Sequence, residues 1–357
     1  MNSLAVLYRT RGDYDRPELL YQQCLAIKEK TLGTDHPEIA IVLSNWAYFY
    51  YFKGDFAKAE PLFQRSLAIS EKVFGPDHLE VAASLNGLAL VFRGKGDYVQ
   101  AESLARRSLA IREKVLGPDH TEVAQTLNNL ALILMARGET STVEPLFQRT
   151  VEIYTKIHGP QSTTLATSLA NLAQFYEAKG NFATAEPLLK QSLEIREKAF
   201  GPNHPAVAET LFRLAALYQA KGDISQAILY QTRSNDVSER DLMRNLVAGS
   251  ERQKLLYLNQ TATITERTLS LNLQTAPQSL EARRVALTVL LRRKGRALDA
   301  LTQAIDTLRQ RQDPETQTLL DDYARLTSQI SVLTLRGPGK QKAEDHLAYL
   351  QSLEEQK

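Results

Sequence analysis

The stretch that decides the fold runs from Gly75 to Leu116 and reads GPDHLEVAASLNGLALVFRGKGDYVQAESLARRSLAIREKVL. Two series of glycines show that related copies of it recur every 42 residues along most of the chain. One series is Gly12, Gly54, Gly96, Gly138, Gly180 and Gly222, and the other is Gly33, Gly75, Gly117, Gly159 and Gly201. A repeat period of roughly 20–50 residues is typical of a solenoid, in which each copy packs on the next.

The glycines divide each copy into two segments with helical spacing. In the first segment, from about 80 to 95, apolar residues such as Leu85, Leu88 and Phe92 recur every three or four positions. The second segment, from about 98 to 116, has the same spacing. A glycine follows each segment, where it can adopt the left-handed conformation that ends a helix. The pattern predicts two antiparallel helices in every copy.

The start of the first helix carries its own signals. Asp77 precedes it, and a short acceptor there is expected to cap free backbone N–H groups of the first turn. Asp35, Asp119 and Asn203 take the same place in other copies. Small residues that let the two helices of a pair approach closely are Ala47, Ala89, Ala131, Ala173 and Ala215 in the first helix, and Ala59, Ala101, Ala185 and Ala227 in the second.

The expected fold is therefore all-α. Residues 1–235 are predicted to form six helix pairs stacked as a right-handed superhelix, with the first helix of each pair on the inner wall. The first pair begins within a helix at Met1, and the sixth ends near Ser234. One copy departs from the pattern, because Val143 replaces the small alanine and GPQST at 159–163 replaces GPDHP. Looser packing is expected there.

The repeats resemble the tetratricopeptide repeat (TPR), in the 42-residue form found in the kinesin light chain and in many bacterial proteins. The motifs that carry this resemblance are LGPDHTEVAQTLNNLALI at 116–133, AEPLF at 59–63 and AIREKVLG at 110–117. The resemblance covers about two thirds of the chain. It implies a right-handed TPR superhelix (an α-α solenoid) that binds a peptide or a partner protein in its concave groove.

After residue 235 the period stops, but helical spacing continues. Helices are expected at about 225–247, 251–273, 279–311, 314–334 and 341–357. We divide this part into an all-helical junction region, 236–336, and a linker with the start of a further helix, 337–357. The segments SERQKLLYLNQ (250–260), RTLSLNLQ (267–274), ALTVLLRRKGRALDAL (286–301) and LTLRGPGK (333–340) resemble the junction that links TPR arrays to CHAT domains. CHAT domains are caspase-like peptidase domains, so this resemblance implies the sensor part of a TPR–CHAT protein, with the catalytic domain absent from this chain and acting as an intramolecular partner.

Composition excludes several functions. Lys+Arg 43 against Asp+Glu 41 leaves a net charge of +2, too little for general attraction to nucleic acid or an anionic membrane. No apolar run approaches the roughly 18 residues of a membrane span, and MNSLAVLYRT at the N-terminus does not have the pattern of a signal peptide. The single cysteine, Cys24, excludes an internal disulfide and is expected to pack in the first repeat. A cytoplasmic location is the prediction.

No catalytic, metal or cofactor site is expected. His36, His78, His120 and His204 lie in different inter-repeat turns, roughly 10–20 Å apart, whereas zinc ligands must converge at about 2 Å. GPGK at 337–340 lacks the phosphate-binding loop pattern and is expected to be a linker. The chain itself is therefore predicted not to be an enzyme. One alternative is a fragment of a cysteine peptidase whose catalytic domain is missing.

The basic run after residue 282 leaves a second alternative open, contact with nucleic acid. It comprises Arg283, Arg284, Arg292, Arg293, Lys294 and Arg296. Glu281 and Asp299 flank it and no aromatic residues alternate with it, which favours a solvated face or a docking surface for a further domain.

The inner wall holds the candidate site. Asn45, Asn129 and Asn171 share one position of the first helix, and Asn86 and Asn128 stand one residue earlier. An amide both donates and accepts hydrogen bonds, as a peptide backbone does, and the resemblance implies that asparagines of the LNNLA motif hold an extended peptide. Gly87 and Arg213 interrupt the series. Tyr48, Tyr51, Arg93, Gln174, Glu177 and Arg213 are expected to project into the same groove. The alternative is that the asparagines pair with neighbouring helices and the groove is merely solvated.

Overall fold

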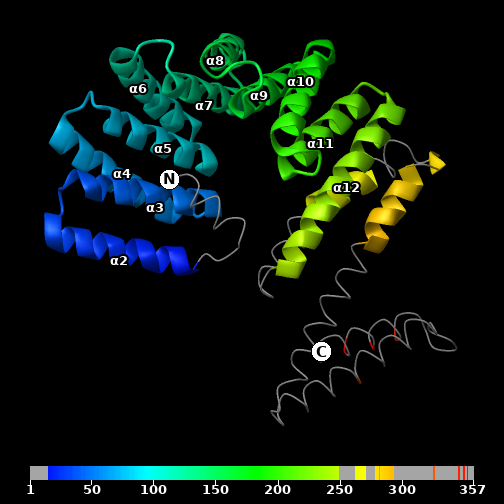
Figure 1. The fold of residues 1–357 in the computed structure, drawn as a ribbon, viewed down its shortest axis with the longest axis horizontal. Helices are drawn as coiled ribbons and strands as arrows, with labels where there is room; N and C mark the ends of the chain where they lie inside the picture. Colours follow the sequence, from blue (N-terminus) through cyan, green and yellow to red (C-terminus); the bar gives the residue numbers. More distant parts are fainter. Residues whose placement is uncertain are drawn as a thin grey trace. The chain divides into compact units, whose positions relative to one another are not determined.

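The computed structural model describes residues 15–248, 262–270, 278–280 and 282–292, and the isolated positions 325, 345, 349 and 352. The chain divides into two compact units, Met1–Ala286 and Leu287–Lys357. The repeats lie in the first unit. Within the described residues every regular element is a helix (Figure 1), which confirms the all-α prediction.

The helices follow the 42-residue period. They are α2 (Asp15–Leu32), α3 (Pro37–Lys53), α4 (Phe56–Phe74), α5 (Leu79–Lys95), α6 (Tyr98–Leu116), α7 (Thr121–Arg137), α8 (Val143–His158), α9 (Thr163–Ala178), α10 (Phe182–Phe200), α11 (Pro205–Ala220), α12 (Ile224–Ala248) and α14 (Ala262–Ser270). The helices expected at 80–95 and 98–116 are observed within one residue of those bounds.

Five complete pairs, from α3–α4 to α11–α12, lie in the described residues, and α2 is the second helix of the pair before them. Each helix packs on the one that follows it, and the first helices also touch one another along the array, α3 with α5, α5 with α7 and α7 with α9 (Figure 1). This is the arrangement of a solenoid. We call the surface formed by α3, α5, α7, α9 and α11 the first-helix face.

Small residues allow the helices of a pair to pack closely, as predicted. Ala47, Ala89 and Ala131 are fully buried, and so are Ala59 and Ala101. Val143, which replaces the second-helix alanine, is also fully buried within the apolar core. The difference in that copy lies at the helix start instead. There α8 begins at Val143 after Thr142, which makes no side-chain capping bond.

The prediction that Asp77 and its equivalents cap the first helices is wrong. The next residue, histidine, is the cap: Nδ1 of His78 accepts from the backbone N–H of Glu80 at 3.2 Å. The same bond is made by His36, His120 and His204. Nδ1 of histidine is as many bonds from Cα as Oδ1 of aspartate, so it reaches the same N–H. Asp77 instead forms an ion pair with Lys114 at 2.6 Å.

Glycine ends the first helices where the left-handed conformation is required. Gly96 has φ 82° and ψ 4°, and its N–H bonds back to carbonyls of the last turn of α5. A side chain resists this conformation, which explains the fixed place of glycine at this point of the period.

The last pair extends beyond the period. The second helix, α12, continues to Ala248, close to the expected 225–247. Buried Gln231 donates to Asn235 at 2.9 Å and to Thr268 of α14 at 3.2 Å, so a polar network joins α12 to α14. Residues 282–292 are helical, within the expected 279–311. The helix α14 lies within the expected 251–273. Apart from isolated positions, the other expected segments up to residue 357, including the GPGK linker at 337–340, lie outside the described residues.

None of the helices in the described part of the chain combines the length and the apolar character that a bilayer span requires.

Candidate functional site

The asparagines of the first-helix face pair with each other across neighbouring repeats. Nδ2 of Asn129 on α7 donates to Oδ1 of Asn86 on α5 at 3.0 Å, and Nδ2 of Asn171 on α9 donates to Oδ1 of Asn128 on α7 at 2.9 Å. Asn86 and Asn129 are buried, whereas Asn128 and Asn171 are half-buried. These side chains therefore stabilise the stacking of first helices, as the alternative in the sequence analysis expected, and the half-buried pair still borders the surface.

Packing explains the interruption of the series at Gly87. A Cβ at this position would lie 2.3 Å from Cε1 of Phe63 and 2.7 Å or less from two further ring atoms. Phe63, on α4, is completely buried. The ring therefore occupies the space that an asparagine side chain would need, and α5 packs directly on it.

Arg213 takes the place of the donor asparagine in the last of these repeats and bonds to a backbone carbonyl instead of a side chain. The residue that would accept its bond is Ala170, whose side chain has no acceptor, and Nη1 of Arg213 donates to the Ala170 carbonyl at 3.2 Å. The same guanidinium reaches Gln174 at 3.4 Å and pairs with Glu209 at 3.4 Å. Arg213 and Gln174 thus lie side by side on the first-helix face.

Glu177 lies near this arginine and is half-buried. Its Oε1 is buried without a hydrogen-bond partner in the described residues. Burial raises the pKa of this carboxyl, and the positive charge of Arg213 opposes that shift.

Aromatic residues dominate the N-terminal part of the first-helix face. Tyr48 meets Phe63 edge to face at a centroid distance of 4.9 Å, and burial raises the pKa of Tyr48. Nη2 of Arg93 donates to the hydroxyl of Tyr51 at 3.3 Å. Asn45, the first member of the predicted asparagine position, is half-buried on α3. In this part of the face, the predicted residues Tyr48, Tyr51 and Arg93 therefore use some of their groups for contacts within the array.

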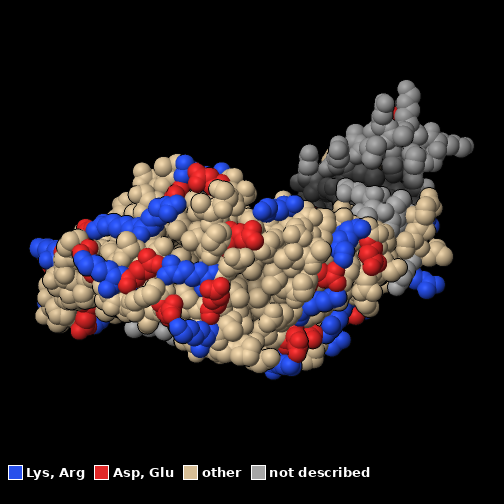
Figure 2. All heavy atoms as spheres, turned by 90° about the horizontal axis from the view of Figure 1, so that it is seen from above, with Lys and Arg blue, Asp and Glu red and all other residues tan. Residues whose placement is uncertain are grey.

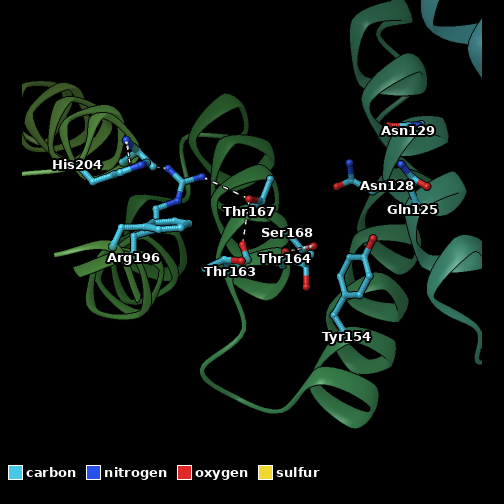
Figure 3. A pocket seen from close by; sticks show the side chains of 12 residues that line it. Gln125, Asn128, Asn129, Tyr154, Thr163, Thr164, Thr167, Ser168, Arg196 and His204 are labelled. Carbon is cyan, nitrogen blue, oxygen red and sulfur yellow. Dashed lines mark hydrogen bonds between the residues drawn. The ribbon is translucent and has the colours of Figure 1, made fainter. Parts of the chain in front are cut away.

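A hollow of about 440 Å³ opens between α7–α8 on one side and α9–α11 on the other (Figure 3). Gln125, Asn128 and Asn129 of α7 line one wall. The first turns of α9 contribute Thr163 and Thr167 to the floor between the walls. Two of the predicted site residues, Asn128 and Asn129, therefore border this hollow.

Both sides of the hollow also contain residues that were not predicted from the sequence. They are Tyr154 at the end of α8, Arg196 and Phe200 at the end of α10, and His204 and Ala206 at the start of α11. A departure from the 42-residue period could have drawn attention to one of these residues, Tyr154. Arg112 and Arg196 hold one position of the second helix, and Tyr154 replaces that arginine in the copy between them.

A second period-42 ladder, of ion pairs, joins the second helices. Arg65 pairs with Glu29 at 2.6 Å and Arg107 pairs with Glu71 at 2.7 Å, and the pattern continues with Arg149–Glu113 and Arg233–Glu197. Within the described residues it fails between α8 and α10, where Thr155 and Gln191 take these places. Acidic and basic side chains are correspondingly mixed on the face that Figure 2 shows.

The other residues considered from the sequence, Cys24 and the basic run after residue 282, do not line the hollow. Cys24 is half-buried, as expected for a packing residue. Arg283, Arg284 and Arg292 are exposed, while Arg293, Lys294 and Arg296 lie outside the described residues. The described residues contain no cluster of three histidine, cysteine or carboxylate side chains arranged to hold a metal ion.

Comparisons with known proteins agree with this architecture. One family model of the tetratricopeptide repeat matches residues 38–114, 88–156, 122–198 and 164–240. Another model of the same repeat matches residues 1–38. No curated protein sequence matches the chain significantly.

Solved structures with the same fold include BtubC (BKLC) from P. vanneervenii, which is 21% identical and covers 63% of this chain and 91% of its own, with a TM-score of 0.53. A putative kinesin light chain from Podosopora anserina, with nearly identical TPR-like repeats, is 25% identical (57% and 97% coverage, TM-score 0.50). A Rap protein complexed with competence and sporulation factor is 16% identical (94% and 84% coverage, TM-score 0.51).

Proposed function

The chain belongs to the tetratricopeptide-repeat family, and on that premise we propose that its first-helix face binds an extended segment of a partner protein. Such repeats serve as scaffolds for protein–protein interaction. The hollow between α7 and α11 carries the proposal, because several polar side chains line one space of about 440 Å³ there.

The polar groups in the hollow suit a peptide backbone. Gln125 is exposed, and Asn128 uses its Oδ1 for Asn171 but makes no hydrogen bond through its Nδ2 within the described residues. An amide group can both donate to a peptide carbonyl and accept from a peptide N–H. The array supplies these groups on helices, which hold them in place more rigidly than loops.

Peptide display on the full chain tests the proposal. Random peptides are selected against it, and the selected peptides are titrated against two double variants. Gln125→Ala with Asn128→Ala changes the first-helix face, whereas Gln148→Ala with Gln191→Ala removes two exposed amides from the second helices. We expect at least tenfold weaker binding to the first double variant and unchanged binding to the second. Equal affinities for both would place the binding surface elsewhere and contradict the proposal.

We also propose, on the resemblance of residues 250–340, that this face is the sensor of a TPR–CHAT protein, with a caspase-like peptidase domain as its intramolecular partner. The polar network of Gln231, Asn235 and Thr268 supports a mechanical link, because it joins the last repeat to α14. Sequencing the reading frame that follows the codon of Lys357 tests this. A frame without a histidine and cysteine in a caspase-like domain would exclude the CHAT assignment and leave the binding function intact.

A further inference from the structure

The hollow differs from the rest of the array in the charge at its helix ends. Three first helices carry an acidic residue at the second helical position: Glu38 in α3, Glu80 in α5 and Glu122 in α7. At this position α9 has Thr164 and α11 has Ala206, and neither helix has an acidic residue in its first turn. Both replacements line the hollow. A helix N-terminus carries roughly half a positive charge, so two uncompensated termini face the same space.

A buried cation adds to this potential. Arg196 is 6% exposed, and its Nη1 donates to the Ala206 carbonyl at 2.9 Å and to Thr210 at 2.8 Å. Its Nη2 extends to Thr167 at 3.5 Å, on the floor of the hollow (Figure 3). Burial lowers the pKa of this guanidinium, but an arginine stays charged. Its counterion, Glu209 at 3.3 Å, is more than half exposed and is not part of the lining.

The equivalent arginine two copies earlier shows the contrast. Arg112 makes the same two bonds, to the Glu122 carbonyl at 3.0 Å and to Thr126 at 2.6 Å. There the acid of the first turn, Glu122, stands beside the guanidinium, with Oε2 at 3.4 Å from Nε. At Arg196 this acid is replaced by Ala206, and the carboxylate that pairs with the guanidinium is instead Glu209, which does not line the hollow.

Tyr154 supplies an independent observation. The residue is 7% exposed, and its hydroxyl, which makes no hydrogen bond to another described residue, is not fully enclosed. Figure 3 shows that hydroxyl directed into the hollow below Asn128 and Gln125. A phenol donates one hydrogen bond and normally finds a partner when it is buried. The Tyr154 hydroxyl is therefore free to donate its hydrogen bond to an acceptor that enters the hollow.

We propose that the hollow is a subsite for a carboxylate carried by the extended segment of the partner, and that an acidic side chain supplies it. This inference rests on the proposed peptide-binding function. The two helix termini and Arg196 attract the anion, while the Tyr154 hydroxyl and the Asn128 amide provide neutral donors. The volume of about 440 Å³ falls within the roughly 300–1,000 Å³ of ligand clefts in proteins.

Fluorescent heptapeptide pools test the subsite on the full chain. Six positions are a mixture of uncharged residues, and the fourth is fixed. The first pool has Glu at that position and an amidated C-terminus, the second has Gln and an amide, and the third has Gln and a free C-terminal carboxylate. We expect the Glu pool to bind at least tenfold more tightly than the Gln amide pool, with a preference that added salt reduces.

Variants that restore the common pattern sharpen the test. Thr164→Glu combined with Ala206→Glu should abolish the preference for Glu, because the added carboxylates repel it, and should not endanger folding, since α3, α5 and α7 carry the same acid. Tyr154→Phe should reduce the preference without abolishing it. Ala183→Glu, at an exposed position in the first turn of α10 that does not line the hollow, is the matched control and should leave the preference intact.

Each other outcome has a defined meaning. Equal binding of all pools would overturn the carboxylate subsite while leaving peptide binding in place. Tighter binding of the third pool alone would assign the site to a chain terminus and overturn the side-chain assignment. A preference for Glu that survives the double variant would move the anion site elsewhere. Failure of every pool overturns the subsite, and failure of peptide display as well overturns the binding function.

Discussion

Gly87 offers a test of the packing that sets the spacing of the repeats. Alanine in place of glycine within a helix normally gains about 0.8–1.0 kcal/mol. Here the new methyl group would lie 2.3, 2.5 and 2.7 Å from three ring atoms of Phe63, where carbon atoms prefer about 3.5–4.0 Å. Because Phe63 is completely buried, the ring must move by about 1 Å against its neighbours. Overpacking of this kind costs about 1–3 kcal/mol.

We therefore expect Gly87→Ala to destabilise the array by about 1–2 kcal/mol. Urea unfolding followed by circular dichroism, and by the fluorescence of the single tryptophan, Trp46, measures this. With a slope of about 2 kcal/mol per molar urea, the midpoint should fall by roughly 0.5–1 M. Gly94→Ala is the matched control. A Cβ there meets Phe56 at 2.4 Å, but that ring is only half-buried and can move aside, so stability should be nearly unchanged.

If the Phe63 ring is the cause, removing it should reverse the sign of the effect of Gly87→Ala on stability. In a Phe63→Ala background, itself about 3–5 kcal/mol less stable, the cavity removes the clash, and Gly87→Ala should then stabilise by about 1 kcal/mol. If Gly87→Ala stabilises the wild-type chain, or has the same effect in both backgrounds, the packing explanation of Gly87 is incorrect.

Three further outcomes are expected. Gly96→Ala forces a side chain into the left-handed conformation and should cost about 1–2 kcal/mol, seen as a lower urea midpoint; an unchanged midpoint would contradict this role. Gln161→Asp restores the partner that Asp77 provides to Lys114, here for Lys198, and should stabilise by at most about 1 kcal/mol, an effect that high salt should remove. Burial lowers the pKa of His204, so its cap contributes stability above about pH 6.5 that is lost as pH falls; His204→Asn should reduce the loss of stability between neutral and acid pH, and identical pH profiles would refute the cap.

Local physics explains how much the sequence determined by itself. Helix boundaries follow from glycine, which alone adopts positive φ at Gly96 without strain, and from apolar residues at intervals of three and four, which lie on one side of a helix. Both signals act over a few residues, so they can be recognised in the sequence without knowledge of tertiary contacts. The 42-residue period then required the copies to stack, because a single helix pair cannot bury its own apolar stripe.

The roles of individual polar side chains needed the tertiary structure. Asp77 and His78 are adjacent acceptors, and only the arrangement of α5 against α6 shows that Lys114 takes the aspartate and leaves the cap to the histidine. The asparagines of the candidate site were found from sequence, but their pairing across repeats, such as Asn129 with Asn86, was one of two open readings.

The hollow could not be predicted from the sequence for a related reason. Tyr154, Thr164 and Arg196 belong to three different helices, and no single sequence motif contains them. Sequence alone determined the repeat, the helix ends and the first-helix face, since these depend on conformational preference and apolar periodicity. Which polar groups remain unpaired, as the Tyr154 hydroxyl does, depends on contacts between residues distant in the chain, and only the packed array decides that.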